Sequence, residues 1–414
     1  MTPEVKERIE QIRHGIVPEG YKKVGSDIIP SDWSKSPFSQ LGVISSGLVN
    51  PKEQPYFEMQ HIGPDNIEKD TGRILETQTA AELGLISGKF YFDSDSIVYS
   101  KIRPNLNKVC APHFEGICSA DCYSIKPTDK IDKAYLLNLM LGYSFNKRAV
   151  ECSMRTGMPK INQDDLNTIA MCYPRSIDEQ KKIAKILTTQ DKVIESKEKL
   201  LAEKQRQKKY LMQVLLTGKM RLPGFDGEWG KSKLGDLLAE RTETKCEHLE
   251  LLAITGVRGV IPRSQLDLKD NSSEDKSKYL RICVGDIGYN TMRMWQGVSA
   301  YSDCEGIVSP AYTILKPKGG INAKFFAYLF KMPEVVFLFY RFSQGLVDDT
   351  RNLKYQNFKR ISVSYPASVE EQTAIVSVLE TADKEIDLLT QEIEQEKIKK
   401  KALMQLLLTG IVRV

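Results

Sequence analysis

Residues 173–221 read YPRSIDEQKKIAKILTTQDKVIESKEKLLAEKQRQKKYLMQVLLTGKMR, and residues 365–413 read YPASVEEQTAIVSVLETADKEIDLLTQEIEQEKIKKKALMQLLLTGIVR. The second stretch repeats the first at a constant offset of 192 (365 − 173), so no insertion or deletion separates the two copies. Both copies begin with Tyr-Pro, continue through Glu-Gln, and end with Leu-Leu-Thr-Gly before an arginine. A chain that contains the same long segment twice is organised as two similar halves.

Both copies are predicted to be long helices, because their apolar residues recur alternately four and three positions apart, as in a coiled-coil seam. The predicted seam consists of Ile183, Leu187, Ile194, Leu201, Leu211 and Leu215 in the first copy and Ile375, Leu379, Ile386, Leu389, Ile393, Leu403 and Leu407 in the second. One such helix would expose an apolar stripe, whereas two of them can cover each other. About 40 residues at about 1.5 Å per residue make a spacer of roughly 60 Å. A structural spacer explains almost every residue of these segments.

Length, charge and cysteine content limit the class of protein. A chain of 414 residues is long enough for about two to three domains. The formal net charge of +5 permits nucleic-acid binding through local patches without requiring it. Eight cysteines without a CxxC pair, and an N-terminus without a secretion signal, predict a cytoplasmic location. No apolar run approaches the roughly 18 residues of a membrane span, so no membrane partner is expected.

Two stretches of short β-branched and aromatic runs, interrupted by Gly, Pro, Asn and Asp, predict compact domains of strands and short helices. Residues 95–103 of the first parallel residues 285–293 of the second, but residues 45–90 and 240–280 share almost nothing. The predicted fold is therefore α+β, with two mixed α/β heads joined by two long coiled-coil helices in a pseudo-two-fold internal repeat. The predicted segments are an N-terminal helix and lead-in at 1–32, a first head at 33–172, a first helical spacer at 173–221, a second head at 222–364 and a second spacer at 365–414.

The N-terminus is predicted to contain a third, partial copy of the helical repeat. Val5, Ile9 and Ile12 share one face of a short amphipathic helix at residues 3–14. Residues 12–16 resemble residues 215–219, where the first long helix ends. We therefore expect the N-terminal helix to pack near the ends of the long helices.

Several short phrases occur in a fixed order along the chain. They are Tyr-Pro at 173–174 with Glu-Gln at 179–180, Leu-Leu-Thr-Gly at 215–218 and 407–410, Gly-Phe-Asp-Gly-Glu-Trp at 224–229, Gly-Asp-Ile at 285–287, and Gly-Met-Pro-Lys-Ile-Asn at 157–162. The second head departs from the last phrase, with Asp-Thr-Arg-Asn-Leu-Lys at 349–354. No single phrase is diagnostic, but their joint order resembles the specificity subunit of type I restriction–modification systems over essentially the whole chain.

The resemblance implies that each head is a target recognition domain that reads one half of a bipartite, asymmetric sequence in double-stranded DNA. It implies that the two helices pack antiparallel, set the spacing between the half-sites, and dock two methyltransferase subunits. Restriction subunits would join the same complex. The chain itself would carry no chemistry and bind no cofactor, and S-adenosylmethionine, ATP and Mg would be bound by the partner subunits.

The candidate DNA-contacting residues are cationic or amide side chains in short loops, because Arg and Lys suit guanine and phosphates while Asn and Gln suit adenine. They are Lys101, Arg103, Asn105, Asn107, Lys108, Arg155 and Lys160 in the first head, and Arg258, Arg263, Arg293, Gln296, Arg351, Asn352 and Lys354 in the second. The alternative for each is a solvated surface charge. The basic runs 204–209 and 397–401 are typical of a solvated helix face, with DNA contact as the alternative.

Neither a metal site nor a catalytic site is predicted. Cys110, His113, Cys118 and Cys122 have a spacing that matches no standard zinc finger, and strand-rich segments often bury single cysteines. Residues 84–89 have the wrong spacing for a phosphate loop, no Asn-Pro-Pro-Tyr or Asp-Pro-Pro-Tyr motif is present, and four scattered histidines offer no evident base.

Two other functions are compatible with parts of the pattern. A non-DNA adaptor with two ligand-binding heads on a coiled-coil spacer would share the architecture, but it need not lose affinity as salt concentration rises. A fused methyltransferase–specificity enzyme would need the catalytic motifs that the sequence lacks.

Overall fold

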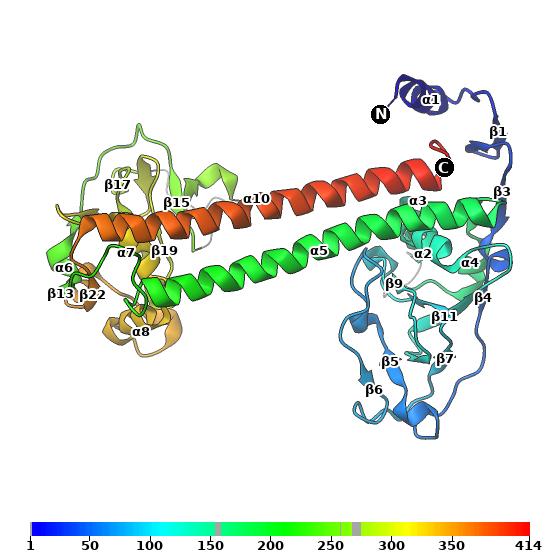
Figure 1. Ribbon diagram of the computed structural model, residues 1–414, viewed down its shortest axis with the longest axis horizontal. Helices are drawn as coiled ribbons and strands as arrows, with labels where there is room; N and C mark the ends of the chain where they lie inside the picture. Colours follow the sequence, from blue (N-terminus) through cyan, green and yellow to red (C-terminus); the bar gives the residue numbers. More distant parts are fainter. Residues whose placement is uncertain (1, 154–158, 257, 267–274) are drawn as a thin grey trace. The chain divides into compact units, whose positions relative to one another are not determined.

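The computed structural model describes residues 2–153, 159–256, 258–266 and 275–414, and Figure 1 shows the elements along the chain. By compactness the chain divides into unit 1, which comprises Met1–Lys197 and Glu392–Val414, and unit 2, which comprises Glu198–Gln391. Each unit contains one head together with parts of both long helices. The compact units therefore differ from the linear division into heads and spacers that the sequence predicts.

The described part of the head in unit 1 contains two four-stranded sheets. The first has the order β4-β11-β8-β9 and consists of β4 (Gly42–Ile44), β11 (Cys122–Pro127), β8 (Ile97–Ser100) and β9 (Val109–Cys110). The second has the order β6-β5-β10-β7 and consists of β6 (Gln78–Thr79), β5 (Gln60–Ile62), β10 (Gly116–Cys118) and β7 (Phe90–Phe92). The remaining elements are α1 (Pro3–Arg13), the hairpin of β1 (Tyr21–Val24) and β2 (Asp27–Pro30), the pair of β3 (Trp33–Pro37) and β12 (Ala170–Pro174), and helices α2 (Lys133–Leu141), α3 (Tyr143–Ser153) and α4 (Gln163–Thr168).

Strand β8 is the centre of this head. Successive side chains of a strand point to opposite faces, and both faces of β8 are covered. Ile97 and Tyr99 enter an apolar cluster that contains Trp33, whereas Val98 enters a second cluster with Phe92. The loop that follows β8 therefore leaves from a strand that is fixed on both sides.

Unit 2 repeats the main sheet of unit 1 in the same strand order. This sheet has the order β14-β21-β18-β19 and consists of β14 (Leu238–Arg241), β21 (Tyr312–Pro317), β18 (Ile287–Asn290) and β19 (Ser299–Tyr301). Further strand pairs are β13 (Trp229–Lys233) with β22 (Ser362–Pro366), β15 (Leu252–Ile254) with β16 (Val260–Pro262), and β17 (Leu280–Ile282) with β20 (Gly306–Val308). The helices of this head are α6 (Leu234–Leu237), α7 (Ala323–Leu329), α8 (Pro333–Phe342) and α9 (Tyr355–Phe358).

The two long helices are α5 (Ile177–Leu215) and α10 (Val369–Leu408). Each begins one turn later than the sequence repeat, because the Tyr-Pro pairs end strands β12 and β22. The hydroxyl oxygens of Ser176 and Ser368 accept the backbone N–H of Glu179 and Glu371 and so cap the two helices. The start predicted from the repeat is therefore wrong by a few residues, since the first residues of each copy belong to a strand. The predicted α+β fold class is confirmed.

Every residue of the predicted seam is buried or half-buried. The buried ones are Ile183, Leu187, Ile194, Leu215, Ile375, Leu379, Ile393 and Leu407, and the half-buried ones are Leu201, Leu211, Ile386, Leu389 and Leu403. Polar seam positions are paired instead: Gln190 donates to Glu396 at 2.7 Å in unit 1, and Lys204 donates to Glu385 at 2.7 Å in unit 2. Residues farther along α5 pair with residues less far along α10, so the helical segments in each unit run antiparallel.

Two ion pairs of unit 2 each have an equivalent in unit 1. Arg221 binds Glu371 through both its Nε and Nη2 atoms at 2.6 and 2.7 Å in unit 2, and Arg413 binds Glu179 in the same way at 2.6 and 2.9 Å in unit 1. The pair Lys208–Asp383 in unit 2 likewise corresponds to Lys400–Asp191 in unit 1. Lys208 and Lys400 lie in the basic runs 204–209 and 397–401, so part of the charge of each run is paired with an acidic residue of the opposite helix.

Three helices end in the same way. Gly15, Gly218 and Gly410 follow α1, α5 and α10, have φ of +74°, +71° and +72°, and each donates its N–H to the carbonyl three residues earlier. Glycine adopts this left-handed conformation without a steric cost. The shared ending supports the predicted relation between the N-terminal helix and the repeat.

The N-terminal segment also contacts the end of α10, as the sequence predicts. Arg8 donates to the carbonyl of Ile411 at 2.6 Å, and the Tyr21 hydroxyl donates to the carbonyl of Gly410 at 2.6 Å. Across the described residues, no helix is long and apolar enough to cross a membrane.

Glu371→Gln is expected to destabilise unit 2 by about 1.5 kcal/mol or more, because it removes the charge of a buried carboxylate that accepts two hydrogen bonds from the half-buried Arg221. Glu385→Gln, on the same helix, removes the more exposed partner of Lys204 and is expected to cost less than about 1 kcal/mol. Urea unfolding of the full chain measures both. Equal losses for the two variants would contradict the structural role of the Arg221–Glu371 pair.

Gly410→Ala is expected to destabilise the chain by more than the about 1 kcal/mol that a left-handed backbone costs an alanine. A Cβ atom at Gly410 would lie 2.6 Å from Pro30, whereas one at Gly15 would meet nothing within 4 Å. Gly15→Ala is therefore the control, with the same backbone conformation and no steric overlap. Thermal unfolding that lowers the midpoint equally in both variants would refute the close packing at Gly410.

Candidate nucleic-acid interface

In unit 1 the loop after β8 is hydrogen-bonded to a second loop that lies far away in the sequence. Ile161 donates its N–H to the carbonyl of Lys101 at 2.9 Å, and Arg103 donates its N–H to the carbonyl of Pro159 at 2.8 Å. Arg103 has a left-handed backbone (φ +48°) and precedes a tight turn at Pro104–Leu106. The structure thus brings Lys101, Arg103 and Lys160 together on one surface.

The side chains of this loop pair differ in exposure. Arg103, Asn105 and Lys160 are exposed. Lys101 is half-buried with its Nζ atom 5.3 Å from the centre of the Tyr123 ring, and burial, followed by the positive charge of Lys160, lowers the pKa of Lys101. An exposed guanidinium, amide and ammonium group around a half-buried lysine form a surface suited to an anionic ligand.

Two predicted contact residues have structural roles in the same loop. Asn107 is buried, has φ of +46°, and donates its amide to the carbonyl of Leu141 at 3.0 Å. Lys108 is half-buried and donates to the carbonyl of Pro64 at 2.6 Å. The position of Asn107 corrects its assignment to the surface, because its side chain supports the loop from inside. Arg155 lies outside the described residues.

Unit 2 contains the equivalent loop pair. Leu353 donates its N–H to the carbonyl of Thr291 at 2.9 Å. This bond corresponds to the one from Ile161 to Lys101 in unit 1, because the two donors are 192 residues apart, which is the offset of the repeat. Arg293, Gln296 and Lys354 are exposed on this pair. One backbone bond is therefore shared by the two heads, whereas the loops differ at the equivalent arginines: Arg103 donates its N–H to Pro159 with φ of +48°, and Arg293 donates its N–H to Asn290 with φ of −130°.

Arg351 and Asn352 lie in the second loop of unit 2 and are held by their neighbours. The Arg351 guanidinium lies 4.1 Å from the centre of the Tyr340 ring and donates to Asp348 at 2.8 Å. Asn352 is half-buried, and its backbone pairs with that of Gln344. Trp295 packs edge-on against Tyr340, with ring centres 6.3 Å apart. Arg351 thus fixes the loop to an aromatic pair and is less available to a ligand than the sequence suggests.

The turn between β15 and β16 borders this surface. Lys331 donates to the carbonyls of Gly256, Gly297 and Ser299 at 3.5, 2.9 and 2.6 Å, and so joins that turn to the segment after Gln296. Arg258 is exposed on the turn, and Arg263 is half-buried in the short turn Arg263–Gln265. The guanidinium of Arg258 donates to the carbonyl of Gln265 at 3.2 Å, which lies in the same short turn as Arg263.

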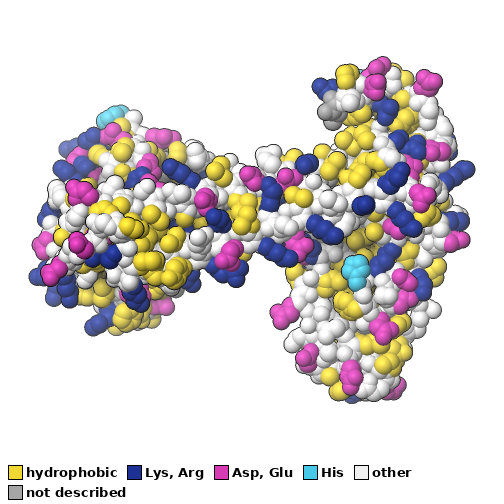
Figure 2. All heavy atoms as spheres, viewed as in Figure 1, with side chains coloured by type: hydrophobic (Ala, Val, Ile, Leu, Met, Phe, Trp, Pro, Cys, Tyr) yellow, Lys and Arg dark blue, Asp and Glu magenta, His cyan; other side chains and the backbone are white. Residues whose placement is uncertain are grey.

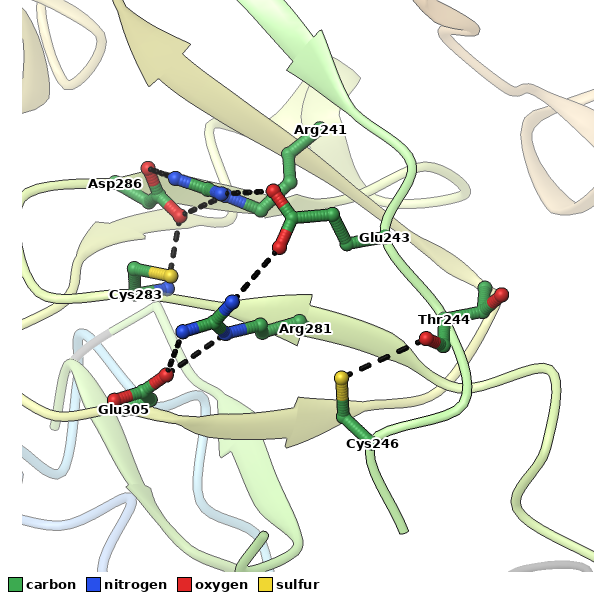
Figure 3. A network of polar contacts seen from close by, with 8 residues as sticks. All are labelled: Arg241, Glu243, Thr244, Cys246, Arg281, Cys283, Asp286 and Glu305. Atoms are coloured by element: carbon green, nitrogen blue, oxygen red, sulfur yellow. Dashed lines mark hydrogen bonds and ion pairs between the residues drawn. The ribbon is translucent and has the colours of Figure 1, made fainter.

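An ion-pair network supports the strand that leads into the loop of unit 2 (Figure 3). Asp286 is buried and accepts hydrogen bonds from Arg241 at 2.7 and 3.1 Å and from the N–H of Cys283 at 2.8 Å. Glu243 and Arg281 extend the network from Arg241, with Arg281 donating to Glu243 at 3.0 Å. The Gly-Asp-Ile phrase at 285–287 therefore has a structural explanation: its carboxylate anchors the start of β18.

The cysteines considered for zinc lie in an apolar environment. Cys110, Cys118 and Cys122 are buried in the cluster that contains Ile62 and Phe92, and burial raises the pKa of the Cys118 thiol to about 12. In the part of the chain that the structure describes, no group of three His, Cys, Asp or Glu residues is placed to hold a metal ion.

Basic and acidic side chains are interspersed on the visible face of each unit, with no large area of one sign (Figure 2). On this face a polyanion would therefore meet local cations rather than a general positive field.

Sequence reasoning missed the residues that shape the interface in unit 2. Lys331 follows a phenylalanine-rich helix and gives no signal in the sequence, because its role depends on three distant carbonyls. Trp295 and Tyr340 were detectable in principle, since Trp295 stands between Arg293 and Gln296 and aromatic side chains among polar ones are typical of nucleic-acid surfaces.

Comparison with known proteins places the chain among restriction–modification proteins. The family model for the type I restriction modification DNA specificity domain matches residues 43–204 and 227–397, which together are most of the chain. The type I restriction enzyme EcoDI specificity subunit of Escherichia coli is 38% identical over 172 residues, a match that spans 42% of this chain and 36% of that protein.

Two solved structures share the fold. The HsdS subunit from Thermoanaerobacter tengcongensis has a TM-score of 0.51 at 17% identity, over 93% of this chain and 98% of that one. The type I restriction–modification S subunit from M. genitalium has a TM-score of 0.56 at 15% identity, over 95% and 99% of the two chains.

Lys331→Met is expected to remove a pH-dependent contribution to the stability of unit 2. Burial lowers the pKa of Lys331 to about 8, below its ordinary value of about 10.4. Between these values the unfolded chain binds more protons than the folded chain, so this contribution to stability rises with pH. The urea midpoint of the unsubstituted protein should therefore rise relative to that of Lys331→Met from pH 7.5 to about pH 9.5. A constant difference across this range would contradict the burial of the charged amine.

Proposed function

The chain belongs to the family of type I restriction–modification DNA specificity subunits, and from this premise we propose that its two heads read the two halves of a bipartite, asymmetric DNA site. The loop pair around Arg103 and Lys160 serves one half-site, and the loop pair around Arg293 and Lys354 serves the other. The observation that carries the proposal is that both heads join the loop after the equivalent central strand to a distant loop by the same backbone bond, but present different side chains there, as at Asn105 and Trp295.

The contacts divide by chemistry. Exposed Arg103, Lys160, Arg293 and Lys354 bind phosphates or guanine edges, whereas Asn105 and Gln296 suit adenine. Lys101 contributes charge from a half-buried position. Because the loops of the two heads differ, the two half-sites need not be related by symmetry, unlike the palindromic sites of dimeric repressors.

The antiparallel helices set the spacing between the half-sites and dock two methyltransferase subunits. Apolar side chains exposed on these helices support a docking role: Ile186 and Val193 in unit 1 are seven residues apart and 36% and 37% exposed, and Leu200 and Leu388 in unit 2 are 48% and 61% exposed. Seven-residue spacing is the repeat with which one helix packs along another. Restriction subunits join this complex, which works in the cytoplasm.

The chain acts as the recognition component, and the chemistry belongs to its partners. S-adenosylmethionine is the cofactor of the methyltransferase subunits, and ATP and Mg are those of the restriction subunits. This chain contributes the placement of DNA: the loop pairs fix which bases are bound, and the helices fix where the partner subunits lie relative to those bases.

Selection from random double-stranded DNA, with the chain alone and with its methyltransferase subunit, tests the proposal. Two short motifs at one fixed spacing are expected, with an affinity that falls steeply as salt concentration rises because phosphate contacts release counterions. Exchange of residues 33–172 for the head of a relative should change one motif and leave the other. Binding that shows neither salt dependence nor sequence enrichment would instead favour a two-headed adaptor that does not bind DNA.

A further inference from the structure

A short hairpin in unit 2 presents an apolar tip beside the loop of Arg293. Gln344 and Asn352 exchange two backbone hydrogen bonds of 2.8 Å and close the hairpin. Gly345 has φ of +129°, and a Cβ atom there would lie 2.6 Å from the carbonyl oxygen of Thr350. The N–H of Thr350 donates to the carbonyl of Val347 at 3.0 Å. These contacts define the shape of the tip.

The tip exposes two aliphatic side chains to solvent. Leu346 is 99% exposed and Val347 is 60% exposed. The base of the hairpin is polar and fixed, because Arg351 pairs with Asp348 and stacks on Tyr340. Leu346 and Val347 thus form an apolar tip on a support held by backbone bonds, an ion pair and a ring contact, so the tip has a defined position from which it can meet a partner.

The hairpin belongs to the same surface as the exposed cations of unit 2. Leu353, just after the hairpin, donates its N–H to the carbonyl of Thr291 at 2.9 Å, two residues before Arg293. Lys354 follows and is exposed. The backbone bond from Leu353 therefore joins the base of the hairpin to the loop of the exposed Arg293, and the exposed Lys354 follows directly, which favours a polyanion with apolar groups within reach.

We infer that Leu346 reads the 5-methyl group of a thymine in the major groove of the second half-site. The inference rests on the proposed function and names a specificity determinant within it. The major groove admits a two-stranded ribbon such as this hairpin, while the minor groove is only about 6 Å wide. On the base edges of the major groove the thymine methyl is the one apolar group, so it is the group that an aliphatic tip can recognise. Val347 covers the same contact from the side.

The test uses the full chain with its methyltransferase subunit and the DNA site obtained by selection. Each thymine of the second half-site is replaced in turn by deoxyuridine, which removes only the methyl group. One replacement is expected to weaken binding about four-fold, as the burial of one methyl-sized group implies. Leu346→Ser should weaken binding to the thymine duplex by a similar factor. The affinity of this variant should be the same for the thymine duplex and for the deoxyuridine duplex.

Ile86→Ser is the matched control, because Ile86 is an exposed aliphatic residue of the first head, 74% accessible. Ile86→Ser should lose as much affinity as the unsubstituted chain when the thymine of the second half-site is replaced by deoxyuridine. The inference is overturned if no deoxyuridine replacement weakens binding of the unsubstituted chain, if the response persists in Leu346→Ser, or if Leu346→Ser weakens only the association with the methyltransferase subunit. The proposed function is judged separately, by binding of the unsubstituted chain to the thymine duplex.

Discussion

The ion pair in which Arg413 donates to Glu179, and its equivalent in which Arg221 donates to Glu371, joins the first turn of one long helix to the residues just after the other. Each bond links one copy of the repeat to the other. Each unit therefore contains the start of the long helix that follows its head in the sequence and the end of the other long helix. Neither unit can form this ion pair with one copy of the repeat alone. This reciprocity gives a physical reason for the similarity of the two repeats, since a change in one copy alters the packing in both units.

The heads divide into a supporting part and a presenting part. The sheets β4-β11-β8-β9 and β14-β21-β18-β19 have the same strand order, and each head closes the same backbone bond beside its central strand, through Ile161 or Leu353. Side chains on the loops share no such constraint: Arg103 has Arg293 as its equivalent, but Asn105 in one head stands where Trp295 occurs in the other. One scaffold can in this way carry two different specificities, and the chemistry of recognition can change without disturbing the core.

Much of the architecture was predictable from the sequence, because it follows from periodicity. The seam residues and the long helices rest on an alternating four-and-three spacing, and the Leu-Leu-Thr-Gly phrase signals a left-handed glycine at each helix end. The site was harder, because exposure depends on contacts far away in the chain. The sequence suggests a surface amide at Asn107, but its side chain donates to the carbonyl of Leu141. It suggests a free cation at Arg351, but the guanidinium stacks on Tyr340. Lys331 acquires its role from three carbonyls that lie 32 to 75 residues away in the sequence.

The central claim is that each head reads its own half-site. It is tested most directly by the affinity for duplexes in which one half-site at a time is scrambled, with Arg103→Ser/Lys160→Ser compared with Arg293→Ser/Lys354→Ser. Each double variant should lose discrimination at one half-site and keep it at the other, and the two variants should affect opposite half-sites. Equal loss at both half-sites in either variant, or no loss in either, would contradict the claim.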